Sequence, residues 1–210
     1  MPPDAVPLLT SEDLARTAAR IGREIAVDHP DGVVLVGVLK GALTFLGDLA
    51  REVRGVPVFV DFVAISRFAP DSGRVRVLKD VDLDLTDRDV VLVEDMVDTG
   101  LTATFLRREM LERGARRVEL CTLLDRPTRR IVPLDVRYRG AEIPDVFVLG
   151  YGLHLDELYR NLDAVYVVDR RVVQEDPHAY LDTLYGRRPV ARPRFEGPGD
   201  GVTFQSEEAP

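Results

Sequence analysis

An acidic segment in mid-chain carries residue types that could do chemistry. The segment VVLVEDMVDTGLT, residues 90–102, opens with four apolar residues and then places Glu94, Asp95 and Asp98 within five positions. A short apolar run of this kind predicts a buried strand. Carboxylates at the end of such a strand cost free energy unless they have partners. In open α/β sheets, ligands bind beyond the carboxyl ends of the strands, so we expect a binding site here.

The residues that follow the acids favour an anion. Asp98–Thr102 would lead into a helix, whose first N–H groups point outward with the positive end of the helix dipole. Gly100 lets the backbone approach a ligand closely. Thr99 and Thr102 add hydroxyl donors, and Leu101 adds a backbone amide. The loop is neither a Walker A loop nor a dinucleotide turn, so it predicts a phosphate cradle of another kind.

The acid pair suits a different group. Glu94 and Asp95 would repel a phosphate, but they can accept hydrogen bonds from a vicinal diol or share a divalent cation. A phosphate cradle beside a diol clamp fits a ribose 5-phosphate. The alternative is that Asp98 only caps the helix and that the acid pair is merely solvated.

Alternating helical and apolar segments are expected to position these residues. An amphipathic helix should begin at Thr10 or Ser11, and residues 67–80 read as a long loop or an irregular hairpin. The pattern of buried strands and helices predicts a doubly wound α/β fold with a central parallel sheet. The further strands are expected within 32–42, 56–66, 90–93, 116–125, 146–152 and 164–169, and the further helices at 42–53 and 102–114.

The composition and charge limit the classes of protein to which this chain can belong. The 210 residues are 45% hydrophobic and 30% charged, with a net charge of −8, which argues against nucleic-acid binding. We expect one domain over residues 1–186, a flexible tail over 187–210, no membrane association and a cytoplasmic location. The single cysteine, Cys121, lies in an apolar run and is expected to be buried.

The acidic segment resembles the binding motif for phosphoribosyl pyrophosphate (PRPP) in type I phosphoribosyltransferases. From about residue 10 to 170 the chain is similar to the hypoxanthine-guanine phosphoribosyltransferase family, through VLVGVLKGALTF, VDFVAIS, DRDVVLVEDMVDTGLT, EIPDVFVLGYGL and LYRNLDAVYVV in this order. The resemblance implies the type I phosphoribosyltransferase fold, with flanking helices and a small hood over the base.

The resemblance also implies a reaction. A ring nitrogen of a purine-type base would displace pyrophosphate from PRPP, with Mg²⁺ as cofactor, in a homodimer or homotetramer. Catalysis would then depend on orientation and preorganised charge. Two other classes are a non-catalytic sensor of PRPP or nucleotides and a phosphoacceptor receiver domain. The receiver is disfavoured by the order of the motifs.

The family's roles map onto numbered residues of the PRPP half. Asp98 matches the general base, and Glu94 and Asp95 would hold the ribose hydroxyls and the metal. The 5′-phosphate loop would comprise Asp98, Thr99, Gly100, Leu101 and Thr102. The pyrophosphate would meet Leu39, Lys40, Gly41 and Arg160, with a non-proline cis peptide between the first two. Simpler interpretations are that Lys40 caps the next helix and that Arg160 pairs with Asp156.

In the base half, Phe147 would stack on the base, Val148 would offer backbone groups to its edge, and Leu153 would line the pocket. Phe147 could instead be core. Three positions depart from the family pattern. Arg67 and Phe68 replace the Ser-Tyr pair of the closing loop, Arg126 replaces the lysine that reads the 6-oxo group, and His154 replaces an acid that helps hold magnesium.

Together these departures predict that the PRPP half is intact and that the base half is altered. One hypothesis is a modified base, such as a 7-deazaguanine bearing a carboxyl or nitrile group, because a guanidinium pairs well with a carboxylate. The other is an ordinary salvage enzyme for hypoxanthine or guanine that tolerates the changes.

Overall fold

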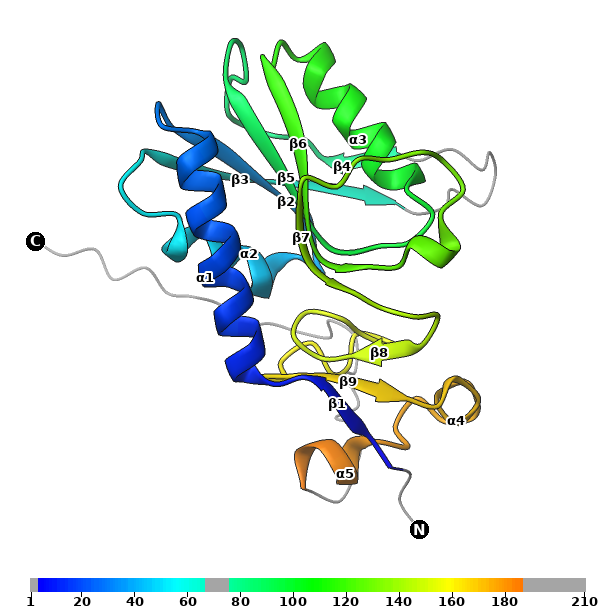
Figure 1. The fold of residues 1–210 in the computed structure, drawn as a ribbon. Coiled ribbons are helices and arrows are strands. Elements are labelled where there is room, and N and C mark those ends of the chain that lie inside the picture. The colour runs from blue at the N-terminus through cyan, green and yellow to red at the C-terminus, as the bar shows by residue number, and fades with distance from the viewer. Residues whose placement is uncertain (1–3, 67–75, 187–210) are drawn as a thin grey trace, which may run out of the picture.

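A six-stranded sheet forms the centre of the molecule, and a smaller three-stranded sheet lies beyond one end of it (Figure 1). The computed structural model describes residues 4–66 and 76–186, to which the statements below refer. The predicted Arg67-Phe68 loop and the tail at 187–210 lie outside these residues. Among the described residues, no helix is long and apolar enough to cross a bilayer.

The central sheet is mostly parallel, as the sequence predicts. Its strand order is β4-β3-β2-β5-β6-β7, and only β3 and β4 run antiparallel. This pairing supports the irregular hairpin over the plain loop, because the register shifts between Ala64 and Ile65. The strands are β2 (Val33–Leu39), β3 (Val58–Ser66), β4 (Arg76–Lys79), β5 (Asp89–Val97), β6 (Arg117–Asp125) and β7 (Tyr138–Glu142).

Helices cover both faces of this sheet, because its strands are apolar on both sides. Val33 and Leu35 of β2 pack into a core with α1 (Ser11–Asp28) and α2 (Leu43–Glu52). Val34 and Val36, which point the other way, pack into a second core with α3 (Leu101–Glu112). The predicted layers are thereby confirmed.

The first helix begins where its sequence predicts. Thr10 is the N-cap of α1, and its hydroxyl accepts a hydrogen bond from the Asp13 N–H. The Asp13 carboxylate accepts in return from the Thr10 N–H at 2.9 Å, which completes a capping box. This end fixes the point at which the chain leaves the small sheet for the central core.

The small sheet is the expected hood, built from both ends of the chain. Its order is β1-β9-β8, with antiparallel pairs between β1 (Val6–Leu9), β9 (Val165–Val168) and β8 (Phe147–Leu149). The predicted strands near 147 and 165 therefore belong to the hood, outside the central sheet. A third core joins these strands to α4 (Arg170–Glu175) and α5 (Leu181–Tyr185).

Some elements escaped the sequence analysis. Strand β1 contains Pro7 and is mostly exposed, and β7 contains Gly140 and Glu142, so neither shows a clear apolar pattern. Both form because the chain returns to the edge of an existing sheet. Cys121 is fully buried, as predicted, and burial raises the pKa of its thiol.

Candidate active site

The acid pair Glu94 and Asp95 lies within strand β5, near its carboxyl end. The strand continues to Val97, whereas the sequence suggested that it would end at the acids. Val90–Val93 are fully buried, Glu94 is 6% exposed, and Asp95 is half-buried. Neighbouring side chains on a strand point to opposite faces, so the two carboxylates face apart. The Met96 N–H donates to Asp95 Oδ1 at 2.8 Å, which orients that carboxylate.

Asp95 meets the loop that follows the neighbouring strand β2. A β-carbon built on Gly41 would lie 1.8 Å from Asp95 Oδ2, so any larger residue there would displace the Asp95 carboxylate or the loop. A β-carbon on Gly152, whose φ is +98°, would lie 2.1 Å from the Gly41 carbonyl oxygen. The Leu39–Lys40 peptide is cis, as the resemblance implies. The predicted pyrophosphate loop and a predicted ribose acid are therefore in direct contact.

The predicted phosphate loop enters α3 as expected, one residue earlier than the pattern suggested. Gly100 is the N-cap of α3, with φ +82°, and the Thr104 N–H donates to its carbonyl at 2.9 Å. The amides of Thr102 and Ala103 thus lie in the first turn, where helices leave N–H groups without helical partners. The Thr99 carbonyl accepts from the Ile131 N–H at 3.0 Å, which holds the loop from outside.

Asp98 does not cap this helix, so that simpler interpretation is wrong. Its carboxylate instead forms an ion pair with Arg126, whose Nη1 lies 3.0 Å from Asp98 Oδ1. Arg126 is 3% exposed, and its Nη2 donates to the Val146 carbonyl at 2.6 Å. Arg126 therefore joins the predicted general base to the start of the hood strand β8.

Two further charges extend this cluster and were not singled out from the sequence. Arg129 Nε lies 2.9 Å from Asp145 Oδ1, and Arg129 Nη1 lies 3.9 Å from Asp98 Oδ2. In the sequence, Arg129 and Asp145 could have been found only from their positions, three residues after Arg126 and shortly before β8. Folding brings the two segments together.

The two cations expected at the pyrophosphate share one acid. Lys40 Nζ and Arg160 Nη2 each lie 3.0 Å from a carboxylate oxygen of Glu157. Arg160 also donates to the Gly152 carbonyl at 2.6 Å. The partner of Arg160 is therefore Glu157 and not Asp156. Lys40 does not cap α2 either, since that helix has no side-chain cap.

The predicted base-binding residues lie along the hood. Phe147 is half-buried, with the Arg170 guanidinium 5.7 Å from its ring centroid. Val148 lies on β8, an edge strand of the described sheet, so one edge of its backbone faces away from β9. Leu153 is 5% exposed and packs into the central core, so its side chain is core. The His154 Nδ1 accepts from the Glu157 N–H at 3.3 Å.

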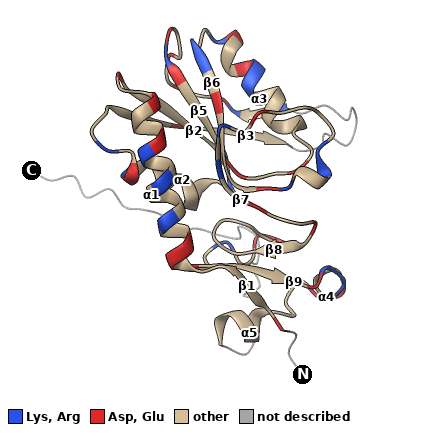
Figure 2. Cartoon of the chain, in the orientation of Figure 1, with Lys and Arg blue, Asp and Glu red and all other residues tan. Residues whose placement is uncertain are grey.

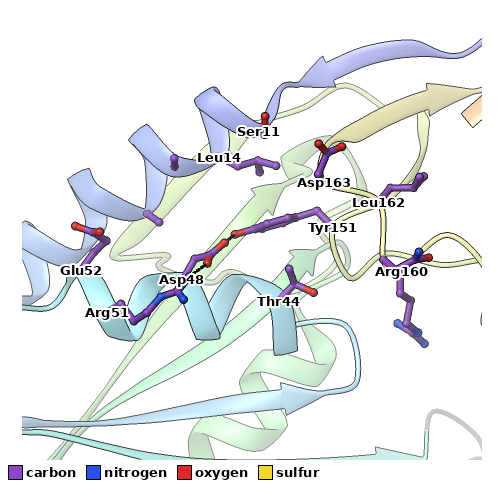
Figure 3. Close-up of a pocket in the computed structure, with 13 residues that line it drawn as sticks. Ser11, Leu14, Thr44, Asp48, Arg51, Glu52, Tyr151, Arg160, Leu162 and Asp163 are labelled. Carbon is purple, nitrogen blue, oxygen red and sulfur yellow. Dashed lines mark hydrogen bonds and ion pairs between the residues drawn. The ribbon is translucent and has the colours of Figure 1, made fainter. Parts of the chain in front are cut away.

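A cavity of about 430 Å³ lies behind this region, between α1, α2 and residues 151–163. Figure 3 shows the Tyr151 hydroxyl directed at Asp48, to which it donates a hydrogen bond. Arg160 borders the cavity, but its guanidinium points away from Asp48 and Tyr151 (Figure 3). The acids of β5 do not line this cavity, and Arg160 is the predicted site residue that borders it.

These contacts define a class of protein. The chain belongs to the phosphoribosyl transferase domain family, whose model matches residues 10–157. More narrowly, it belongs to the hypoxanthine-guanine phosphoribosyltransferase family. The hypoxanthine-guanine phosphoribosyltransferase of Mycobacterium avium is 42% identical over 178 residues, covering 80% of this chain and 87% of the relative. That of Bacillus subtilis is 34% identical over 171 residues, covering 80% and 94%.

Solved structures agree with the sequence relatives. A hypoxanthine-guanine phosphoribosyltransferase from Bacillus anthracis, with a HEPES molecule in its active site, superposes with a TM-score of 0.74 at 36% identity, covering 78% of this chain and 98% of that chain. A hypoxanthine phosphoribosyltransferase from Staphylococcus aureus gives a TM-score of 0.75 at 34% identity, covering 79% and 92%. The resemblance read from the motifs is confirmed.

Proposed function

We propose that this protein transfers the phosphoribosyl group from PRPP to a 6-oxopurine base, hypoxanthine or guanine, and releases pyrophosphate. The observation that carries the proposal is the packing of Gly41 against Asp95. This contact brings the loop after β2, which we expect to bind pyrophosphate, beside Asp95 of β5, the strand that leads to the loop at Gly100. The three segments that the sequence predicts to bind the anions and the sugar thus lie at one edge of the sheet, where α/β proteins bind ligands.

In the proposed reaction, the bond from the sugar's anomeric carbon to pyrophosphate breaks, and a bond from that carbon to a base nitrogen forms. Pyrophosphate leaves with the electron pair, so Lys40 and Arg160 would stabilise its growing negative charge. Asp98 would accept the proton that the base loses. The ion pair with Arg126 would hold the Asp98 carboxylate in place, between the loop that enters α3 and the start of β8.

The side chains of the site would bind magnesium only if the substrate's phosphate oxygens supplied further ligands. The described residues contain no group of three or more metal-binding side chains close enough to form a cage. Mg²⁺ commonly binds through one or two carboxylates plus substrate phosphates, and Glu94 and Asp95 offer hard oxygen ligands of this kind. The ion would neutralise phosphate charge when bound. His154 would offer a nitrogen ligand, which magnesium binds less well than oxygen, and its Nδ1 accepts a hydrogen bond from the Glu157 N–H.

The base would sit between Arg126 and the hood strand β8, with Phe147 against its ring. The Arg126 guanidinium, whose Nη atoms contact Asp98 and the Val146 carbonyl, would offer a remaining N–H group to an oxo group of the base. The names of the relatives support hypoxanthine and guanine. No observation favours a modified 7-deazaguanine, and none favours a non-catalytic sensor.

We also propose a homodimer or homotetramer. Large apolar side chains on β3 and α2 are exposed, with Phe59 and Val60 each at 44% and Leu43 at 54%. A subunit interface would bury exposed apolar side chains such as these. Light scattering coupled to size-exclusion chromatography would give the mass in solution and test this directly.

The decisive test is turnover. The protein is incubated with PRPP, Mg²⁺ and either hypoxanthine, guanine or xanthine, and both nucleotide and pyrophosphate are measured. We expect rapid, stoichiometric formation of both products with hypoxanthine or guanine and strongly reduced formation with Asp98→Asn. Binding of PRPP without any product from all three bases would contradict the proposal.

A further inference from the structure

Glu157 holds the two cations that the proposed function assigns to pyrophosphate. Its Oε2 lies 3.0 Å from Lys40 Nζ, and its Oε1 lies 3.0 Å from Arg160 Nη2. Lys40 belongs to the loop after β2, whereas Arg160 follows the hood strand β8. The carboxylate thus bridges the central sheet and the hood, across the space between two cations that would otherwise repel each other.

The backbone presents Glu157 to this position. Its φ of +65° lies in the left-handed region, which side chains other than glycine, asparagine and aspartate rarely adopt. The Leu158 N–H donates to the Leu155 carbonyl at 2.8 Å, and the Glu157 N–H donates to His154 Nδ1. The turn therefore points the side chain back toward Lys40 and Arg160. Hydrogen bonds from Arg160 and then Lys40 lower the Glu157 pKa to about 2, so it is ionised at neutral pH.

We propose that Glu157 is an internal stand-in for pyrophosphate, which occupies the leaving-group subsite of the free protein and must be displaced when PRPP or pyrophosphate binds. The inference rests on the proposed function, since it assumes that Lys40 and Arg160 receive pyrophosphate. A carboxylate bridging two cations makes the same charge-assisted hydrogen bonds as a phosphoryl group, at lower charge. Glu157 would then keep the subsite assembled while empty and compete for it when product leaves.

This competition has a defined sign. If Glu157 competes with pyrophosphate, removing its charge should tighten the binding of pyrophosphate and PRPP and slow product release. If Glu157 only positions Arg160 for the ligand, removing its charge should weaken both. Lys40 and Glu157 are exposed, with side-chain exposures of 66% and 56%, so each pair is a modest, salt-screened interaction.

The test compares Glu157→Gln with the control Asp156→Asn. The control removes a neighbouring negative charge, and Asp156 forms no ion pair with the described residues. The inhibition constant of pyrophosphate against PRPP, the KM for PRPP and kcat are measured for each. For Glu157→Gln we expect the first two to fall about three- to tenfold, as two exposed ion pairs predict. We expect kcat to fall where pyrophosphate release limits turnover, and Asp156→Asn to resemble the parent protein.

An unchanged or increased pyrophosphate inhibition constant in Glu157→Gln would overturn the inference. Calorimetry of magnesium pyrophosphate binding gives the same comparison without turnover. Glu157→Asp tests whether side-chain length matters, because a shorter acid cannot span both cations and should behave like the glutamine variant. Loss of the proposed function itself looks different. In that case the parent protein forms no nucleotide with any base, whatever residue stands at 157.

Discussion

Gly41 lies so close to Asp95 that a β-carbon on Gly41 would fall 1.8 Å from the Asp95 Oδ2 atom. On its other side, the Gly41 carbonyl oxygen lies 2.1 Å from the β-carbon position of Gly152. The loop after β2 is thus packed between β5 and the turn after β8. Any side chain at position 41 must displace either the Asp95 carboxylate or the loop that carries Lys40.

Gly41→Ala should therefore abolish most activity while leaving the cores intact. A displacement of about 1 Å of a positioning group can cost roughly 100-fold in rate, and we expect at least that loss in kcat/KM for PRPP. Gly47→Ala is the matched control, because a β-carbon on Gly47 meets nothing within 4 Å. Steady-state kinetics check the prediction, with circular dichroism melts to verify folding. Comparable losses from both substitutions would contradict it.

Asp98→Asn should separate chemistry from binding. The amide cannot accept the proton of the base, so we expect kcat to fall by about 10²- to 10⁴-fold, the usual contribution of a general base. PRPP binding should persist, because the backbone of the phosphate loop is unchanged. Calorimetry with PRPP and single-turnover kinetics measure the two effects. A variant with near-parental kcat would show that Asp98 is not the base.

Arg126→Lys tests the buried fork at the base pocket. Arg126 contacts both Asp98 and the Val146 carbonyl, and a lysine can reach only one of them. A buried acceptor left unpaired costs about 1–3 kcal/mol, so we expect the KM for hypoxanthine to rise and the melting temperature to fall. Arg108→Lys, an exposed change on α3, is the control and should be neutral. Unaltered kinetics and stability would mean that the fork is dispensable.

Figure 2 shows acidic and basic residues interspersed along α1 and α3. A separate ion cluster lies at the start of β5, where the buried Asp89 contacts His29, Arg116 and Arg117. Burial alone would raise the Asp89 pKa, but hydrogen bonds from Arg116, His29 and Arg117 outweigh it and lower that pKa to about 2. The lowered pKa stabilises the fold above pH 3.8, and this contribution is lost as the pH falls toward 2.

Asp89→Asn should therefore cost about 2 kcal/mol of the free energy of unfolding at neutral pH, and the cost should shrink in acid. Urea unfolding at pH 7, 4 and 3 measures this dependence. Asp135→Asn, at an exposed acid, is the control and should change stability by under about 0.5 kcal/mol. An Asp89→Asn variant with the same loss at every pH would exclude the charged pairing as the cause.

The sequence alone determined the central architecture and the position of the acidic segment and its loop at the end of β5. Apolar runs such as Val90–Val93 can only be satisfied by burial on both faces, and the capping box at Thr10 is a local pattern. The acids of β5 and the loop at Gly100 are also consecutive in the chain. Short-range patterns of this kind appear in the sequence because their physics acts between near neighbours.

Only the tertiary structure decided which distant residues meet. The pairing of Arg126 with Asp98 and of Lys40 with Glu157 joins positions 28 and 117 residues apart. Helical i,i+4 spacing suggested Asp156 as the partner of Arg160. The segment is a turn in which Glu157 has a left-handed backbone conformation, and Glu157 is the acid that pairs with Arg160. Strands β1 and β7 likewise exist because a sheet edge is available to them. Such contacts depend on how loops return to the sheet, which local propensity does not encode.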